Sequence, residues 1–260
     1  MVIKECVPNF LHPKNTIGRY ILNLSNHKVI GGPFKGMVLQ YPAKLFSDNT
    51  SAIFPKLLGI YEKEVFQFLE RVTQSKHDAI INIGAGEGYY AVGLAILKPE
   101  AKVLAYETLE ELQALITQNA LANSVNNQIQ INGCCSITDL NEVIQLYKRP
   151  FIMIDCEGFE FELLDPSNIK GLGNCDILVE THDFKGTDTF DILINRFKNS
   201  HDADFSSALP RTTKDIPISL PLWARFLPEY YKSYVAREGR VKTDQKWILF
   251  TSRKPYSTTA

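Results

Sequence analysis

Short apolar segments alternate with segments of helical periodicity through the middle of the chain. The apolar segments predict strands at Ala79–Ile83, Val103–Tyr106, Ile129–Ile131, Phe151–Ile154, Ile177–Glu180 and, near the end, Trp247–Thr251. The intervening segments predict helices at Tyr89–Leu97, Leu109–Asn123, Ile137–Tyr147, Phe159–Leu164 and Phe190–Lys198. Strands alternating with helices at this pitch are typical of a parallel sheet with helices on both faces. We therefore predict an α/β fold.

The two ends of the chain differ from this alternating region, which suggests how the chain is divided. We predict a main domain at residues 77–252, an N-terminal extension packed on it at 1–76, and a tail at 253–260. Within the main domain, residues of about 206–245 hold four prolines together with Trp223, Tyr230, Tyr231 and Tyr234. This segment is too aromatic for a linker, so we expect a lid-like insertion before the last strand.

A glycine-rich turn follows the first predicted strand and precedes the first helix. Gly84, Gly86 and Gly88 allow a sharp turn and a close approach to a ligand. The dinucleotide fingerprint places its third glycine one residue later, where this chain has Tyr89. Glu87 would repel a pyrophosphate but suits a ligand with an ammonium and a sulfonium group. The loop thus favours S-adenosylmethionine over NAD; the alternative is a tight turn without a ligand.

An acidic residue ends the second predicted strand. Glu107 lies 19 residues beyond Gly88, near the spacing at which a carboxylate holds the hydroxyls of a ribose. Taken alone, Glu107 would be a solvated charge at the start of a helix, as Glu110 and Glu111 also suggest. Together with the glycine loop, it predicts a ribose contact.

Two carboxylates follow the fourth predicted strand. Asp155 and Glu157 are two residues apart, so they face the same way in extended backbone, at the edge where open α/β sheets bind ligands. They could hold a cationic ligand, act as a general base or bind a metal. By contrast, we expect Glu160 and Glu162 only to complement the dipole of the following helix.

The fifth predicted strand brings a histidine to the same edge of the sheet. Glu180 and His182 are again two residues apart, and histidine has a pKa suited to proton abstraction near neutrality. A single histidine is often structural, but this position at the carboxyl end of a strand favours a catalytic role.

Charge and composition narrow the classes of protein. The net charge is −1, yet residues 77–210 carry 8 basic and 20 acidic side chains, between basic ends. This argues against a generic nucleic-acid binder, and an apolar content of 45% argues against disorder. The sequence shows no secretory leader and no apolar segment long enough to cross a membrane. It has five cysteines, an odd number, and none of them form a C-x-x-C pair. We therefore expect a cytoplasmic protein with no membrane partner.

These motifs together resemble a known family. INIGAGEGYYAVGLA, followed by an acid at the end of the second strand, resembles class I S-adenosylmethionine-dependent methyltransferases. FIMIDCEGFEFELL and ILVETHDF, with the flanking GPFKGM, PKLLGIYEKEV and REGRVKTDQKWILF, resemble the FkbM-type methyltransferases. The likeness extends over residues 31–252. It departs from the family pattern at Met153, where a lysine is usual, and at Phe159, where a small residue is usual.

The resemblance implies a Rossmann-like fold whose seven-stranded sheet is mostly parallel, with an antiparallel last strand. It also implies that S-adenosyl-L-methionine is the cofactor. The implied cofactor-binding residues are Gly84, Ala85, Gly86, Gly88, Glu107, Gly133, Cys134 and Asp155. Among these, the glycine loop surrounds the methionine part, Gly133 and Cys134 contact the adenine, and Asp155 lies near the amine and the methyl group. Family members commonly methylate hydroxyl groups of sugars or natural products.

The predicted function is therefore methyl transfer to a hydroxyl of a small molecule. His182 or Glu157 would remove the acceptor's proton, and Glu180 would orient the histidine or the acceptor. We expect no metal and no nucleic acid; the alternative is a cation bridging Asp155, Glu157 and His182, for which the oxygen-rich set suits Mg²⁺ or Ca²⁺ better than zinc. The other functional alternatives are a catalytically silent binding protein with this fold and an NAD-dependent dehydrogenase.

Overall fold

The computed structural model describes residues 12–41, 52–182, 188–238 and 245–254. The chain divides into two compact units. The helical unit comprises Met1–Lys63 and Leu209–Thr243, and the sheet unit comprises Glu64–Ala208 and Asp244–Ala260. Among the residues that the structure describes, no helix has the length and apolar character needed to cross a membrane.

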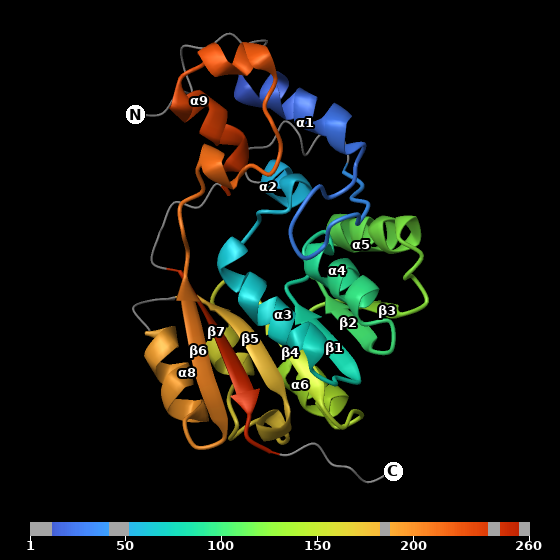
Figure 1. The fold of residues 1–260 in the computed structure, drawn as a ribbon. Coiled ribbons are helices and arrows are strands. Elements are labelled where there is room, and N and C mark those ends of the chain that lie inside the picture. Colours follow the sequence, from blue (N-terminus) through green and yellow to red (C-terminus); the bar gives the residue numbers. More distant parts are fainter. Residues whose placement is uncertain (1–11, 42–51, 183–187, 239–244, 255–260) are drawn as a thin grey trace. The chain divides into compact units, whose positions relative to one another are not determined.

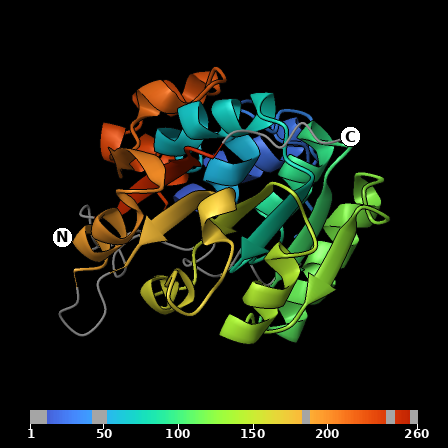
Figure 2. The same ribbon diagram turned by 90° about the horizontal axis from the view of Figure 1, so that it is seen from below.

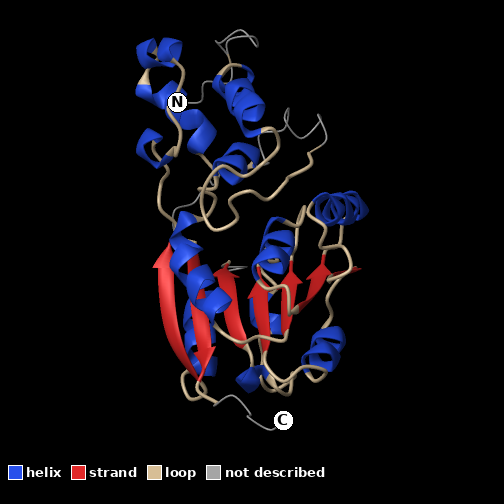
Figure 3. Ribbon diagram, turned by 45° about the vertical axis from the view of Figure 1, so that its right-hand side comes forward, coloured by secondary structure: helices blue, strands red, loops and turns tan. Residues whose placement is uncertain are grey.

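The sheet unit contains seven strands in the order β3-β2-β1-β4-β5-β7-β6 (Figure 3). They are β1 Ala79–Ile83, β2 Lys102–Tyr106, β3 Ile129–Asn132, β4 Pro150–Ile154, β5 Asp176–Thr181, β6 His201–Ser207 and β7 Lys246–Ser252. The first five pair in parallel, and β7 lies antiparallel between β5 and β6. This arrangement confirms the predicted Rossmann-like, mostly parallel sheet with an antiparallel last strand.

The helices of the sheet unit follow the strands in alternation (Figure 1). They are α3 Phe66–Gln74, α4 Tyr89–Leu97, α5 Glu110–Ala122, α6 Ile137–Ile144, α7 Glu160–Leu163 and α8 Thr189–Phe197, with 3-10 turns at Lys63–Val65 and Leu172–Asn174. Figure 2 shows helices on both sides of the sheet. The predicted helices are confirmed, except that α6 ends three residues earlier than expected and α7 is a single turn.

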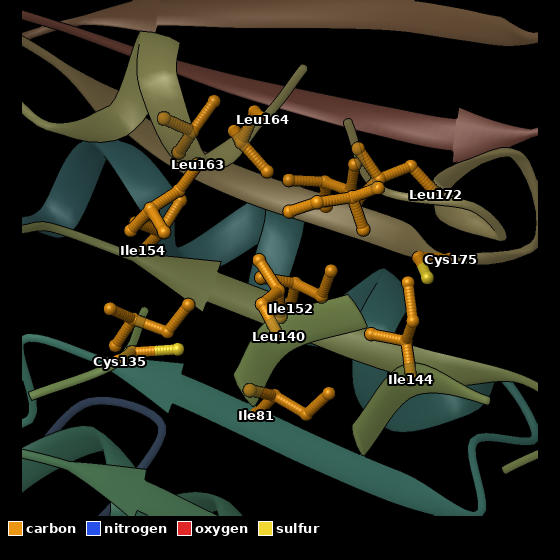
Figure 4. Close-up of a cluster of buried hydrophobic side chains, with 14 of the residues drawn as sticks. Ile81, Cys135, Leu140, Ile144, Ile152, Ile154, Leu163, Leu164, Leu172 and Cys175 are labelled. Carbon is orange, nitrogen blue, oxygen red and sulfur yellow. The ribbon is translucent and has the colours of Figure 1, made fainter. Parts of the chain in front are cut away.

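A core of buried aliphatic side chains fixes the sheet against α6, α7 and α8 (Figure 4). Ile81, Ile152 and Ile154 come from adjacent strands, and Leu140 and Leu163 come from the covering helices. Alternate strand residues supply this core because successive side chains point to opposite faces of a sheet. Helix α4 packs against β1 and β2, and its buried side chains are not part of this cluster. The packed strands between these layers position the loops at their ends.

Strand β6 was not predicted. Its sequence, His201–Ser207, places Asp202 and Asp204 on exposed positions, and of its seven residues only His201 is buried. An edge strand with charged side chains lacks the apolar run that marks a buried strand. The predicted insertion of about 206–245 therefore begins inside β6, and its residues 239–244 lie outside the described part of the chain.

The helical unit is built from short elements. They are α1 Ile17–Ser25, α2 Ile53–Leu58 and α9 Glu229–Ser233, with 3-10 turns at Pro13–Asn15, Thr213–Asp215, Leu222–Phe226 and Tyr234–Ala236. A buried ion pair joins Arg211 Nε to Glu238 Oε1 at 3.0 Å, and Arg211 also donates to the carbonyl of Ile60. The segment after β6 is thereby tied to the segment that follows α2 within this unit.

Candidate active site

The glycine loop joins β1 to α4 in a backbone conformation that requires glycine. Gly84, Gly86 and Gly88 all have positive φ angles, of 75°, 56° and 88°. A Cβ atom on Gly84 would lie 1.7 Å from the carbonyl oxygen of Asp155, whereas one on Gly86 would meet nothing within 4 Å. Gly84 therefore allows the ends of β1 and β4 to touch, and Gly86 faces open space, while its neighbour Ala85 is buried.

Glu107 follows β2 and faces this loop. Its Oε2 accepts a hydrogen bond of 2.8 Å from the Gly86 amide, and its Oε1 accepts one of 2.9 Å from the Leu109 amide. The side chain is buried. A carboxylate offers about four lone-pair sites, so two backbone bonds leave acceptor capacity for ligand hydroxyls. The loop and the predicted ribose residue are thus joined directly.

Gly133 and Cys134 lie just beyond β3, beside the end of β2. The carbonyl of Asn132, the last residue of β3, accepts a hydrogen bond from the Glu107 amide at 3.1 Å. A Cβ on Gly133 would meet no atom within 4 Å, and the Cys134 thiol belongs to an exposed residue. These two residues therefore lie at the same edge of the sheet as Glu107, in open surroundings.

The segment after β4 turns sharply. The Asp155 amide donates to the carbonyl of Ile83 at 3.0 Å, and Glu157 and Gly158 then adopt positive φ angles of 57° and 111°. The expectation that Asp155 and Glu157 share a direction because the backbone is extended is wrong, since Glu157 has a left-handed conformation. The Glu157 side chain is 86% exposed and nevertheless reaches the same place as Asp155.

Glu160 is the site residue that the sequence interpretation missed. It was expected only to complement a helix dipole, but it is fully buried. Its carboxylate accepts hydrogen bonds of 3.0 Å from the amides of Cys156 and Gly158, and lies 3.1 Å from His182 Nδ1. Burial alone would raise the pKa of Glu160, but the bonds from His182 and the backbone outweigh it and hold this pKa below its ordinary value.

His182 follows β5 and is held at both its backbone and its ring. Thr189 Oγ1 donates to the His182 carbonyl at 2.7 Å, and Glu160 fixes Nδ1. The opposite ring nitrogen, Nε2, lies 3.9 Å from Asp155 Oδ1, 3.9 Å from Glu157 Oε2 and 3.8 Å from Glu180 Oε2. The structure therefore brings together the four residues that the sequence placed at two strand ends.

The charges of this cluster shift the pKa values of its members. Burial would lower the pKa of His182, but the hydrogen bond to Glu160 and the charges of Asp155, Glu160 and Glu157 raise it above 6.5. Burial raises the pKa of Asp155, and the charge of Glu157 acts in the same direction, whereas His182 opposes it. The cluster is therefore strongly acidic in composition and favours a positively charged occupant.

Comparison with known proteins shows the fold of the chain. No family model and no curated protein matches the sequence. The methyltransferase domain of METTL16 is 11% identical, with a TM-score of 0.51 over 96% of this chain and 83% of that one. Two further structures have TM-scores of 0.45. The O-methyltransferase TomG from Streptomyces achromogenes, in complex with SAM, is 12% identical over 83% of this chain and 82% of that one. Precorrin-6y C5,15-methyltransferase from Geobacter metallireducens is 15% identical over 72% of this chain and 88% of that one. The chain has the Rossmann-like fold of class I methyltransferases.

Proposed function

We propose that the chain is an S-adenosylmethionine-dependent methyltransferase. The observation that carries this proposal is the contact between Glu107 and the Gly86 amide, which places a carboxylate against a loop of three left-handed glycines. In this fold, ligands bind at the carboxyl ends of the strands. A carboxylate at that position can accept bonds from both hydroxyls of a ribose, while the open side of Gly86 admits the rest of the ligand.

The acidic character of the site supports this cofactor over NAD. Glu87 lies within the loop, where a dinucleotide would place its pyrophosphate. S-adenosylmethionine instead brings an ammonium and a sulfonium, which the carboxylate of Asp155 would stabilise. Gly133 and Cys134, at the end of β3, would contact the adenine. The residues proposed to hold the cofactor thus come from the ends of four adjacent strands.

We further propose that the acceptor is a hydroxyl group of a small molecule, as in the FkbM-type family that the motifs resemble. Methyl transfer is an in-line displacement in which the cofactor supplies the leaving group. The protein has to align the acceptor oxygen with the methyl carbon and exclude water. The acceptor's proton also has to leave, either to His182 or Glu157 with Glu180 as the orienting group, or to solvent from a hydroxyl already polarised in the cluster.

Calorimetric titration of the full chain tests the cofactor assignment. S-adenosylmethionine and S-adenosylhomocysteine are expected to bind, and NAD is not. Glu107→Ala is expected to weaken binding at least tenfold, because a bond to a charged acceptor contributes about 1.5–3 kcal/mol. Glu110→Ala, an exposed acid on the first turn of α5, is the matched control and should bind as the wild type does.

Results that differ from these expectations would favour one of the alternative functions or remove a residue from the proposed site. If NAD gives a heat of binding and the two adenosyl ligands give none, the dehydrogenase alternative is favoured. Binding of the adenosyl ligands without turnover of any hydroxylated acceptor would favour the silent binding protein. Equal affinities for Glu107→Ala and wild type would remove Glu107 from the ribose site, provided that circular dichroism shows both variants to be folded.

A further inference from the structure

We propose that Asp155, Glu157 and His182 form a binding site for a hard divalent cation, which activates the acceptor hydroxyl. The second half of this inference rests on the proposed methyltransferase function; the first half does not. Within the described part of the chain, these three residues each offer one ligand atom, and the atoms lie within 4.8 Å of one another. All three belong to the sheet unit.

The distances in the cluster suit a shared ion better than direct hydrogen bonds. His182 Nε2 lies 3.9 Å from an oxygen of Asp155 and 3.9 Å from an oxygen of Glu157. A hydrogen bond between nitrogen and oxygen spans about 2.7–3.2 Å, so neither pair makes one. Two ligands that each lie about 2.1–2.5 Å from one ion are separated by roughly 3–5 Å, and both pairs lie in this range.

The imidazole is oriented as it is in carboxylate–histidine–metal sites. The Glu160 carboxylate already accepts two backbone N–H bonds and lies 3.1 Å from His182 Nδ1, so as an acceptor it places the imidazole proton on Nδ1. In the neutral ring, Nε2 then carries a lone pair that points at the carboxylates. Glu160 is itself fixed by the amides of Cys156 and Gly158. Such an outer carboxylate sets the tautomer and the ring orientation of a metal ligand.

An unsatisfied oxygen gives a second indication. Asp155 Oδ1 is buried and has no hydrogen-bond partner among the described residues. Buried polar atoms are almost always paired, so an exception calls for an occupant such as water or an ion. This oxygen is also the Asp155 atom that faces His182 Nε2. The rest of the Asp155 side chain is 31% exposed, so the covered Oδ1 is the oxygen that faces into the cluster.

The ligand set indicates the class of cation and its role. Carboxylates and water suit Mg²⁺, Mn²⁺ and Ca²⁺, while one imidazole is compatible with Mn²⁺. Because Glu157 is exposed, the cation would keep open positions for water or an acceptor hydroxyl. Bound there, the hydroxyl would release its proton to solvent, its oxygen would bond to the methyl carbon, and the electron pair of the carbon–sulfur bond would remain on sulfur. His182 is then a ligand and not the base.

Titration of the full chain with Mn²⁺, followed by the electron paramagnetic resonance signal of the free ion, tests the site without any activity measurement. We expect one Mn²⁺ per wild-type chain, and competition by Mg²⁺. Glu157→Gln and His182→Ala should each weaken Mn²⁺ binding at least tenfold, since even outer-sphere substitutions cost about 10–100-fold. Glu157 is exposed, so its variant is expected to fold normally.

Glu162→Gln is the matched control, because Glu162 is an exposed carboxylate on the adjacent turn α7 and outside the cluster. Its Mn²⁺ affinity should equal that of the wild type. Absence of Mn²⁺ binding at millimolar concentration, or equal affinities in wild type, Glu157→Gln and His182→Ala, would overturn the proposal. Titrating the same metal-free samples with S-adenosylmethionine separates this failure from a failure of the proposed function, because cofactor binding does not require the cation.

Discussion

Gly84→Ala is expected to lower the free energy of unfolding by about 3 kcal/mol or more. A side chain in the left-handed region costs roughly 1–2 kcal/mol. The added Cβ would also lie 1.7 Å from the Asp155 carbonyl oxygen, so the exit of β4 has to move. That movement would break the bond from the Asp155 amide to Ile83, worth about 0.5–1.5 kcal/mol.

Gly86→Ala is the matched comparison, because the same residue type changes in the same loop. Its φ angle is also positive, but the new Cβ would meet no atom within 4 Å. We expect a loss of only about 1–2 kcal/mol together with weaker binding of S-adenosylmethionine, since the methyl group occupies the open side of the loop. Urea unfolding gives the stabilities, and calorimetry gives the affinities. Equal stabilities of the two variants would contradict the contact between β1 and β4.

The fold could be predicted because its signals are local. Each buried strand of the parallel region is a short apolar run, and glycines mark the turn from β1 to α4. The edge strand β6 could not be found this way, since an exposed strand with Asp202 and Asp204 has no apolar run to mark it. Its place is fixed by pairing with β7, far away in the sequence.

From the sequence, only those site residues could be predicted that lie at the ends of strands. Asp155, Glu180 and His182 lie at carboxyl ends of neighbouring parallel strands, and that rule brought them together. The role of Glu160 depends on two features that the local pattern does not show. Gly158 reverses the chain so that Glu160 meets its amide, and β5 delivers His182 to the same carboxylate from 22 residues away. The flanking Phe159 and Phe161 do not mark Glu160 as buried, since Phe159 is itself 57% exposed.

A buried charge network closes the opposite edge of the sheet, where β1, β4 and β5 begin and β7 ends. Asp176, the first residue of β5, pairs with His77 Nε2 at 2.8 Å and with Arg149 Nη2 at 3.1 Å. Its Oδ1 also accepts a bond of 2.8 Å from the Ser252 amide. The carboxylate thus joins residues that flank or end four strands, and it does so away from the candidate active site.

Asp176→Asn is expected to lower the free energy of unfolding by about 3–5 kcal/mol at neutral pH, because removing one partner of a buried ion pair leaves the other charge uncompensated. Burial would raise the pKa of Asp176, but the bonds from His77 and Ser252 and the charge of Arg149 outweigh it and hold this pKa below 3.8. A carboxyl whose pKa is depressed by folding stabilises the protein above its ordinary pKa. That contribution is lost as the pH falls below about 4. Urea unfolding of both proteins between pH 7 and pH 3 should therefore show a difference that narrows toward acid.

Asp202→Asn provides the control for this prediction, because it removes the same charge on the edge strand β6. Asp202 is 71% exposed and pairs with Arg253 at 2.8 Å. Exposed ion pairs contribute about 0–1 kcal/mol, so this variant should unfold almost as the wild type does at every pH. A similar loss in both variants would mean that net charge, and not the buried network, governs stability. A loss in Asp176→Asn that is the same at pH 3 and pH 7 would show that geometry and packing, rather than the ionised carboxylate, hold this edge together.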